Sequence, residues 1–172
     1  VNQLLQLSRA DRHKESLHLE EFDLSELTEM VAEEAQGLAE SKAVTLTAEI
    51  EPGILVKADQ TLMMRIWLNL LTNAVKYGRQ QGQIWLTLKS DGKNAVGTVR
   101  DDGIGISAAE LPKIWKRFYR VNTARSSGDD SGTGLGLAMV KWMVESHGGT
   151  VSAVSTLGAG STFSFTIPLR PS

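Results

Sequence analysis

The chain has 172 residues, enough for one domain with a buried core, and its 41% of hydrophobic residues is ordinary for a globular protein. Its formal net charge of −2 lacks the positive excess typical of nucleic-acid-binding domains, so we expect no nucleic-acid partner. Cysteine is absent, which excludes a disulfide scaffold and a cysteine-ligated zinc site, and no apolar run reaches the ~18–20 residues that a membrane span requires.

The N-terminal segment is interpreted separately from the rest. VNQLLQLSRADR, residues 1–12, reads as the end of an amphipathic helix, and a helix of this length is marginal in isolation, so we expect it to begin upstream. We therefore divide the chain into residues 1–16, a helix remnant with a linker, and residues 17–172, the main domain. We interpret the whole as a fragment of a longer protein.

The periodicity and turn signals of residues 17–101 predict a mixture of strands, helices and a hairpin. The expected elements are a strand near Leu17–Phe22, a helix capped by Asp23 or Ser25 and ending near Ser41, strands at 44–50 and 53–59, a long helix from Asp59, and a hairpin over 83–101. Asp91-Gly92 is the turn signal of that hairpin.

The second half continues the mixture of helices and hairpins. We expect a short helix over 107–118, a long polar loop over 120–134, a helix over 135–147 that stops at Gly148, and a hairpin over 150–169. Steady alternation of strand and helix is missing. The order favours an α+β fold, a two-layer α/β sandwich with a mixed, mainly antiparallel sheet and about three main helices on one face.

The helix from Asp59 carries two asparagines one turn apart, Asn69 and Asn73, opposite its apolar face. Lys76 lies in the same arc and Tyr77 at its edge. A solvated stripe would explain them, but such stripes are normally Glu, Lys or Gln, and Asn costs about half a kcal/mol against Ala in a helix. Amide oxygens suit Mg²⁺ when phosphates supply its negative ligands, and Lys76 can meet those phosphates. Both interpretations remain open from this segment alone, and Tyr77 can equally be plain packing or lie on a ring.

RDDGIGI, residues 100–106, ends a strand with Asp101, Gly103 and Gly105. One interpretation is a tight turn that leaves the hairpin. The other is a pocket in which the Asp101 carboxylate, an acceptor only, binds an exocyclic amine such as the N6 group of adenine.

SGTGLGL, residues 131–137, places Gly132, Gly134 and Gly136 at the start of a helix, where free N–H groups favour an anion. It fits neither the Rossmann nor the P-loop pattern. We interpret it as a hinge and phosphate cradle, with the preceding loop as a flexible lid over the ligand. Arg120 borders this lid and is the basic side chain best placed to reach a terminal phosphate.

Four segments together resemble a known family. NLLTNAVKY, DDGIGI, KIWKRFY and GTGLGLAMV resemble, in order and spacing, the N, G1, F and G2 boxes of sensor histidine kinases. GAGSTFSFTIPL resembles the terminal hairpin of that family, and the resemblance covers roughly residues 20–170. It implies the Bergerat ATP-binding fold of gyrase-type and chaperone ATPases, with ATP and Mg²⁺ as cofactors.

The resemblance also implies roles for individual residues. Asn73 would be the Mg²⁺ ligand, and Asn69 would support it. Lys76 and Arg120 would contact phosphate. Asp101 would hold the adenine amine, and Tyr77 would pack beside the ring. The other implied nucleotide-binding positions lie in the two glycine segments: Gly103, Gly105, Ile106, Gly132, Thr133, Gly134, Leu135 and Gly136.

The histidines depart from the family pattern. LLQLSRAD resembles the end of the second dimerisation helix, but neither His13 nor His18 lies in a motif of the type His-acid-apolar-basic-Thr-Pro. The phosphoacceptor His is therefore expected upstream of this chain. His147 is explained by a helix C-terminus and receives no catalytic role.

The resemblance further implies partners and a location. The partners would be the dimerisation and phosphoacceptor domain of the parent chain and a cognate response regulator. The parent would be a homodimeric bacterial inner-membrane sensor with this domain in the cytoplasm, and the isolated fragment a monomer.

Three alternatives remain. A gyrase- or chaperone-like ATPase would need a general-base Glu four residues before the Mg²⁺ ligand, where this chain has Asn69, an amide that cannot accept a proton from water. An anti-sigma-type serine kinase shares the boxes, but the N-terminal helix remnant argues against it. A module that binds nucleotide without catalysis is the third.

Overall fold

The computed structural model describes residues 17–116 and 133–170 of the protein, with only the backbone of residues 133–135. The elements in chain order are β1 (Glu20–Asp23), α2 (Leu24–Ser41), β2 (Thr45–Ile50), β3 (Leu55–Ala58), α3 (Gln60–Tyr77), β4 (Gln83–Ser90), β5 (Asn94–Asp101), the 3-10 turn η2 (Leu111–Lys113), α4 (Thr133–Ser146), β6 (Val151–Thr156) and β7 (Gly160–Pro168). The expected helix remnant at 1–12 and the expected lid at 120–132 lie outside the described residues.

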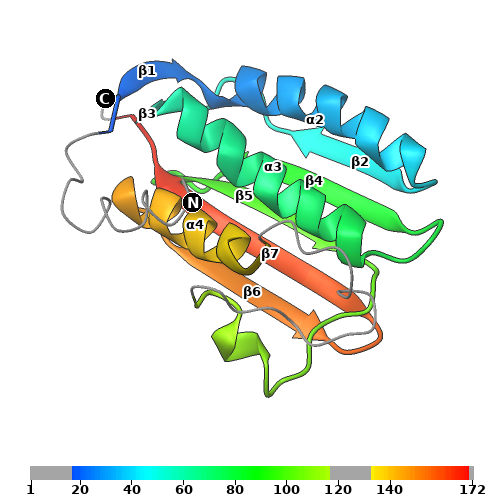
Figure 1. Ribbon diagram of the computed structural model, residues 1–172. Coiled ribbons are helices and arrows are strands. Elements are labelled where there is room, and N and C mark those ends of the chain that lie inside the picture. Colours follow the sequence, from blue (N-terminus) through cyan, green and yellow to red (C-terminus); the bar gives the residue numbers. More distant parts are fainter. Residues whose placement is uncertain (1–16, 117–132, 171–172) are drawn as a thin grey trace.

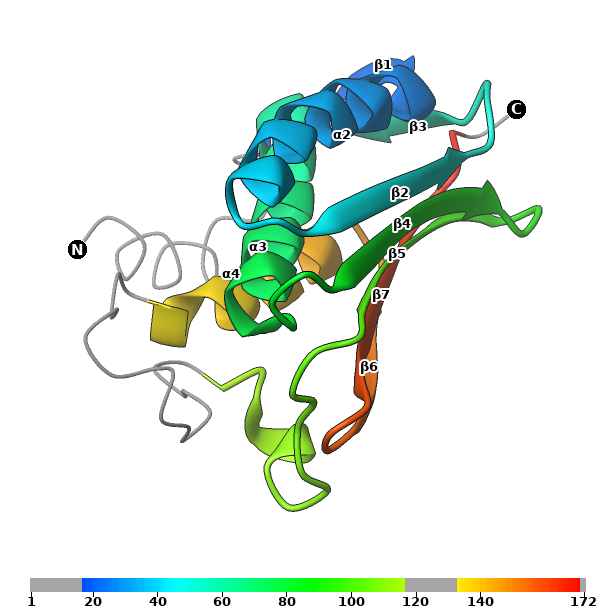
Figure 2. The ribbon, with the colours of Figure 1, turned by 90° about the vertical axis from the view of Figure 1, so that its right-hand side faces the viewer.

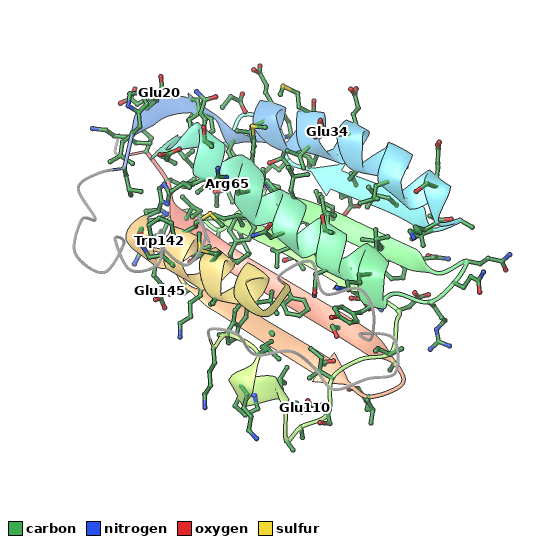
Figure 3. The ribbon with its side chains drawn as sticks, in the orientation of Figure 1. Glu20, Glu34, Arg65, Glu110, Trp142 and Glu145 are labelled. Atoms are coloured by element: carbon green, nitrogen blue, oxygen red, sulfur yellow. The ribbon has the colours of Figure 1, made fainter. Side chains whose placement is uncertain are left out.

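The main sheet has five strands in the order β2-β4-β5-β7-β6, and a separate antiparallel pair joins β1 to β3. Only the β2–β4 pairing is parallel within the five-stranded sheet. Helices α2, α3 and α4 lie side by side on one face of this sheet (Figure 1), and no helix of the described residues covers the opposite face (Figure 2). Glu34 of α2 and Glu145 of α4 mark the two sides of this helical layer, with Arg65 of α3 between them (Figure 3). The predicted α+β sandwich is confirmed.

Two of the helices begin directly after an aspartate: Asp23 is one of the two caps expected for α2, and α3 is expected to start at Asp59. Asp23 caps α2, where its Oδ1 accepts a hydrogen bond from the N–H of Glu26 at 3.1 Å. Asp59 caps α3 in the same way through the N–H of Leu62, also at 3.1 Å. Such caps stabilise a helix by about 1 kcal/mol because they satisfy an amide that has no partner within the helix. Among the helices in the described part of the chain, none combines the length and apolar character needed to cross a membrane.

The apolar face of α3 is seated on the centre of the sheet. Trp67 is fully buried and meets Phe165 of β7 edge to face, with ring centroids 4.9 Å apart and an angle of 73° between the planes. Gly97 of β5 makes room for this pair, because a Cβ there would overlap Phe165 and lie 2.8 Å from Cη2 of Trp67. This edge-to-face ring pair therefore sets how closely α3 approaches the strands.

The short helix expected over 107–118 is wrong within its described part. Residues 107–116 form turns and the single 3-10 turn η2, with i to i+3 bonds such as Lys116 N–H to the Lys113 carbonyl at 3.0 Å. Pro112 provides the physical reason: it has no N–H to donate, and it disfavours helical geometry at Leu111 before it. Helix α4 also differs from expectation, since it begins at Thr133 rather than Leu135.

His147 joins the C-terminus of α4 to the N-terminus of α3. Its Nε2 accepts a hydrogen bond from the Asp59 N–H at 3.0 Å, so Nδ1 carries the proton and donates to the Met143 carbonyl at 2.7 Å. The predicted role at a helix C-terminus is confirmed, with Gly148 at φ +81° ending the helix. Burial lowers the pKa of His147, against the raising influences of the Met143 carbonyl and the Asp59 carboxylate. The neutral ring is the form that the fold uses.

Protonation of His147 should weaken the fold in acid. Because its pKa is depressed from the ordinary 6.5 in the folded protein, the unfolded chain binds more protons, and stability falls as the pH drops from 6.5 through the folded value. We expect His147→Gln, whose amide oxygen can still accept the Asp59 N–H, to flatten this part of the dependence. The measurement is the free energy of urea unfolding across this pH range. His18→Gln, which removes an exposed histidine, is the control; an equal change of slope in both variants would contradict the assignment to His147.

The space around Gly97 gives a second prediction. Gly97→Ala should lower the free energy of unfolding by about 1–3 kcal/mol, since the methyl group would push two large buried rings out of place. Gly37→Ala is the matched control, because Gly37 lies in α2 with no atom within 4 Å of the added Cβ. That change should instead stabilise the protein by about 0.5–1 kcal/mol. Chemical denaturation of both variants tests this opposition, and equal signs would show that ring packing does not limit position 97.

Candidate functional site

The polar arc of α3 lies at its C-terminal half and is not a solvated stripe. Asn69, Asn73, Lys76 and Tyr77 are each half-buried. The Asn69 Nδ2 donates a hydrogen bond to the carbonyl of Gly136 in the first turn of α4 at 3.4 Å. The predicted asparagine face therefore borders the second glycine segment. The ammonium of Lys76 lies 5.6 Å from the centre of the Tyr77 ring.

Asp101 is a buried carboxylate at the end of β5, with 6% of its surface exposed. Its Oδ1 accepts a hydrogen bond from the Gly103 N–H at 2.8 Å. Burial raises its pKa from 3.8 to about 6, which the N–H groups of Gly103 and Ser161 oppose and the charge of Asp102 reinforces. Since hydrogen bonds compensate the buried charge only in part, an additional N–H donor would stabilise the ionised carboxylate.

The turn after Asp101 packs directly on the end of α3. The Ile104 N–H donates to the Tyr77 carbonyl at 3.3 Å, and a Cβ on Gly103 would overlap that carbonyl and lie 2.7 Å from the Cα of Gly78. Gly105 has φ +73°, and a Cβ there would overlap the Thr156 carbonyl. Both glycines are therefore required by protein backbone that passes close to them. This packing brings Asp101 to the end of the asparagine face.

The same turn makes further contacts that sequence reasoning missed. The buried Ile106 donates its N–H to the Ser155 Oγ at 2.7 Å, and this hydroxyl also lies 2.8 Å from the Ser161 Oγ. Arg79 donates from its guanidinium to the carbonyls of Asp102 and Gly158. No spacing or composition signal marks these residues, because a serine in a strand and a single arginine after a helix are common.

The second glycine segment is described only in part. Gly136 is half-buried in α4, and no described atom lies within 4 Å of a Cβ placed on it. Packing within the described part therefore does not explain a residue that costs about 1 kcal/mol in a helix. The backbone of Thr133, Gly134 and Leu135 forms the start of α4, whereas Gly132 and Arg120 lie outside the described residues.

The ligand types near this site bear on the kind of metal it can hold. Residues 17–116 and 133–170 contain no group of three or more His, Asp or Glu side chains placed to bind a metal ion. Among the described side chains near these two helices, the amide oxygens of Asn69 and Asn73 could bind a cation together with oxygen atoms of a ligand. That donor set fits Mg²⁺, which commonly binds proteins through few side chains plus substrate phosphates.

Removal of the Asp101 charge should stabilise the protein in neutral solution. The folded-state pKa lies above the ordinary 3.8, so the stabilising contribution of this group is complete below 3.8 and is lost as the pH rises through about 6. Asp101→Asn keeps an acceptor for Gly103 and should raise the unfolding free energy by about 1–3 kcal/mol above pH 6, with no gain in strong acid. Chemical denaturation at several pH values measures the difference.

Asp91→Asn is the control for that experiment. The N–H groups of Lys93 and Asn94 bond to the Asp91 carboxylate and lower its pKa, so its removal should not stabilise the protein. A stabilisation by Asp91→Asn equal to that of Asp101→Asn would point to net charge rather than burial as the cause.

The comparison with protein families agrees with this geometry. Residues 58–171 match the family described as histidine kinase-, DNA gyrase B-, and HSP90-like ATPase. The matched region contains α3, the Asp101 turn and α4, and so it spans every described part of the site.

Individual relatives include sensor histidine kinases. The sensor histidine kinase TmoS of Ectopseudomonas mendocina is 38% identical over 171 residues, which cover 99% of this chain and 18% of that protein. Among solved structures, the mycobacterial sensor histidine kinase MprB has a TM-score of 0.77 at 28% identity, covering 89% of this chain and all of that one. Full-length ShkA in complex with AMPPNP has a TM-score of 0.84 at 28% identity, covering 99% of this chain and 35% of that one. The chain thus spans about a fifth of the length of TmoS.

Proposed function

Because this chain belongs to the family of histidine kinase-, DNA gyrase B- and HSP90-like ATPases, as an ATP-binding catalytic domain of the sensor histidine kinase type, we propose that it presents the γ-phosphoryl group of Mg-ATP to a histidine elsewhere in its parent protein. The observation that carries the proposal is the contact of the Asp101 turn with the end of α3 through Gly103 and Tyr77. This contact supports the proposal, because it joins the turn that carries the buried Asp101 to the end of the helix that carries Asn69 and Asn73.

We assign the adenine end of the site to Asp101. The carboxylate accepts a hydrogen bond from the exocyclic amine, and Tyr77 packs beside the ring. Gly103, Gly105 and Ile106 shape the turn that holds the carboxylate in place. The partly compensated charge of Asp101 supports this role, because an amine donor supplies a hydrogen bond that the fold leaves incomplete.

We assign the phosphate end to α3 and to the start of α4. Asn73 provides the Mg²⁺ ligand, Asn69 supports it, and Lys76 and Arg120 contact phosphate. The glycine segment borders the phosphates as the end of a lid: Gly132, Thr133, Gly134, Leu135 and Gly136. The bond from Asn69 to the Gly136 carbonyl supports the assignment, because it joins the two halves of this end.

Transfer of the phosphoryl group requires no covalent bond to the residues of this domain. A nitrogen of the acceptor imidazole attacks the γ-phosphorus in line, the bond from that phosphorus to the β–γ bridging oxygen breaks, and ADP leaves with the electron pair. The imidazole then gives up its other N–H proton to solvent. Bound Mg²⁺ would neutralise charge on the phosphates, while the side chains of this domain orient the triphosphate.

A gyrase- or chaperone-like ATPase is the main rival. Hydrolysis in that class would need a general base where this chain has Asn69, whose amide donates to Gly136 and cannot take up a proton. The serine kinase and the non-catalytic binding module are weaker rivals. The first would transfer the phosphoryl group to a serine, and the second would transfer none.

The parent protein is proposed by the same reasoning. Residues 1–16 would be the remnant of the second dimerisation helix with a linker, and residues 17–172 would form the catalytic domain. The acceptor His would lie on that dimerisation domain, from which the phosphoryl group passes to an Asp of a response regulator. We propose a homodimeric inner-membrane sensor as parent, with this domain in the cytoplasm and monomeric when isolated.

Calorimetry with a non-hydrolysable ATP analogue tests the two ends of the site separately. We expect Mg²⁺ to strengthen binding about tenfold or more, and Asn73→Ala to remove most of that gain. Asp101→Asn should weaken binding about 10- to 100-fold with or without Mg²⁺, as expected for loss of a hydrogen bond to a charged acceptor. Asn94→Ala, at the far hairpin turn, should leave binding unchanged.

Phosphoryl transfer is tested in the longer parent chain. Asn73→Asp and Asp101→Asn should each abolish phosphorylation of the upstream His, and Asn94→Ala should retain it. Normal transfer in both site variants would refute these residue assignments. Fast ATP turnover by residues 1–172 alone would favour the ATPase rival instead.

A further inference from the structure

Arg79 connects two loops that are distant in the sequence. It follows α3 closely and is exposed, yet two of its guanidinium nitrogens donate hydrogen bonds to backbone carbonyls. Its Nε donates to the Asp102 carbonyl at 2.7 Å and its Nη2 to the Gly158 carbonyl at 2.9 Å. Both acceptors are neutral carbonyls, so this contact is not a surface ion pair of the kind that contributes little.

The two loops that Arg79 joins are the ones that surround Asp101. The Gly158 N–H donates to the Ile104 carbonyl at 2.7 Å, so the guanidinium closes a ring of hydrogen bonds through the turn and the β6–β7 hairpin. Asp102 is held a second time, because its Oδ1 accepts the Gln83 N–H at 3.0 Å. Arg79, in the connection from α3 to β4, and Gln83, at the start of β4, thus bond to the carbonyl and the carboxylate of Asp102, the residue next to Asp101.

We propose that Arg79 is a positioning residue for the nucleobase, which fixes the Asp101 turn against the end of α3 and so sets adenine affinity and selectivity. The inference rests on the proposed function, in which Asp101 binds the adenine amine. A planar fork with fixed N–H directions can serve two carbonyls at once, whereas the single ammonium of lysine cannot reproduce that geometry. Arg79→Lys therefore removes the geometry and keeps the charge.

The experiment compares adenosine, guanosine, ADP and inorganic tripolyphosphate as ligands in magnetic resonance titrations of residues 1–172. Arg79→Lys should weaken adenosine and ADP about 3- to 10-fold each, reduce the preference for adenosine over guanosine, and leave tripolyphosphate affinity unchanged. Arg170→Ala is the control: it removes an exposed arginine, paired with Glu21 at 3.4 Å outside the site, and should change none of these values. An equal loss of affinity for adenosine and tripolyphosphate in Arg79→Lys would overturn the proposal, because it would show a general loss of structure or of electrostatic attraction.

A double-mutant cycle with Asp101→Asn completes the test. If Arg79 acts through Asp101, adding Arg79→Lys to Asp101→Asn should weaken adenosine no further. Full additivity of the two effects would overturn the positioning role. The two proposals fail differently. Unchanged adenosine binding by Asp101→Asn would refute the proposed adenine site. Weaker adenosine binding by Asp101→Asn together with unchanged binding by Arg79→Lys would refute the role of Arg79 alone.

Discussion

The seating of α3 on the sheet is the contact on which the site depends. Trp67 and Phe165 meet edge to face above Gly97, and this buried contact fixes both the height and the rotation of the helix. Because one side of α3 is committed to the core, Asn69 and Asn73 lie on its other side, where Asn69 reaches the Gly136 carbonyl of α4. A change in core packing at this point would therefore act on the site through rotation of the helix rather than through any direct contact.

Backbone contacts, more than side chains, bring the site together. The Asp101 turn reaches α3 because Gly103 has no Cβ to keep it from the Tyr77 carbonyl, and Gly105 allows the following reversal. The arrangement buries a carboxylate whose pKa is raised to about 6, so the folded protein carries an unfavourable charge at neutral pH. Such a cost is typical of binding sites, where function and maximal stability favour different residues.

Helix α4 is tied to α3 at both of its ends, but unequally. At its C-terminus His147 accepts a hydrogen bond from the N–H of Asp59, the N-cap of α3, at 3.0 Å, and a bond of 2.7 Å to the Met143 carbonyl of α4 holds the ring in place. Near its N-terminus the tie made by described side chains is a longer amide bond of 3.4 Å from Asn69 to the Gly136 carbonyl. The weaker tie lies at the phosphate end, where our proposal needs the chain to respond to a ligand. The firm tie at the far end gives α4 a fixed point for such a response.

The sequence by itself determined the features that depend on near neighbours: the start of α2 near Asp23 or Ser25, the start of α3 at Asp59, the apolar stripe of α3, the Asp91-Gly92 hairpin, and the ordered boxes that identify the family. A cap or a helical stripe is encoded within about four residues, so local reasoning can find it. The tertiary structure decided the rest: the turns in place of a helix around Pro112, and the partners of His147 and Arg79. Those partners lie 88, 23 and 79 residues away along the chain, where only the packed fold brings them within hydrogen-bonding distance.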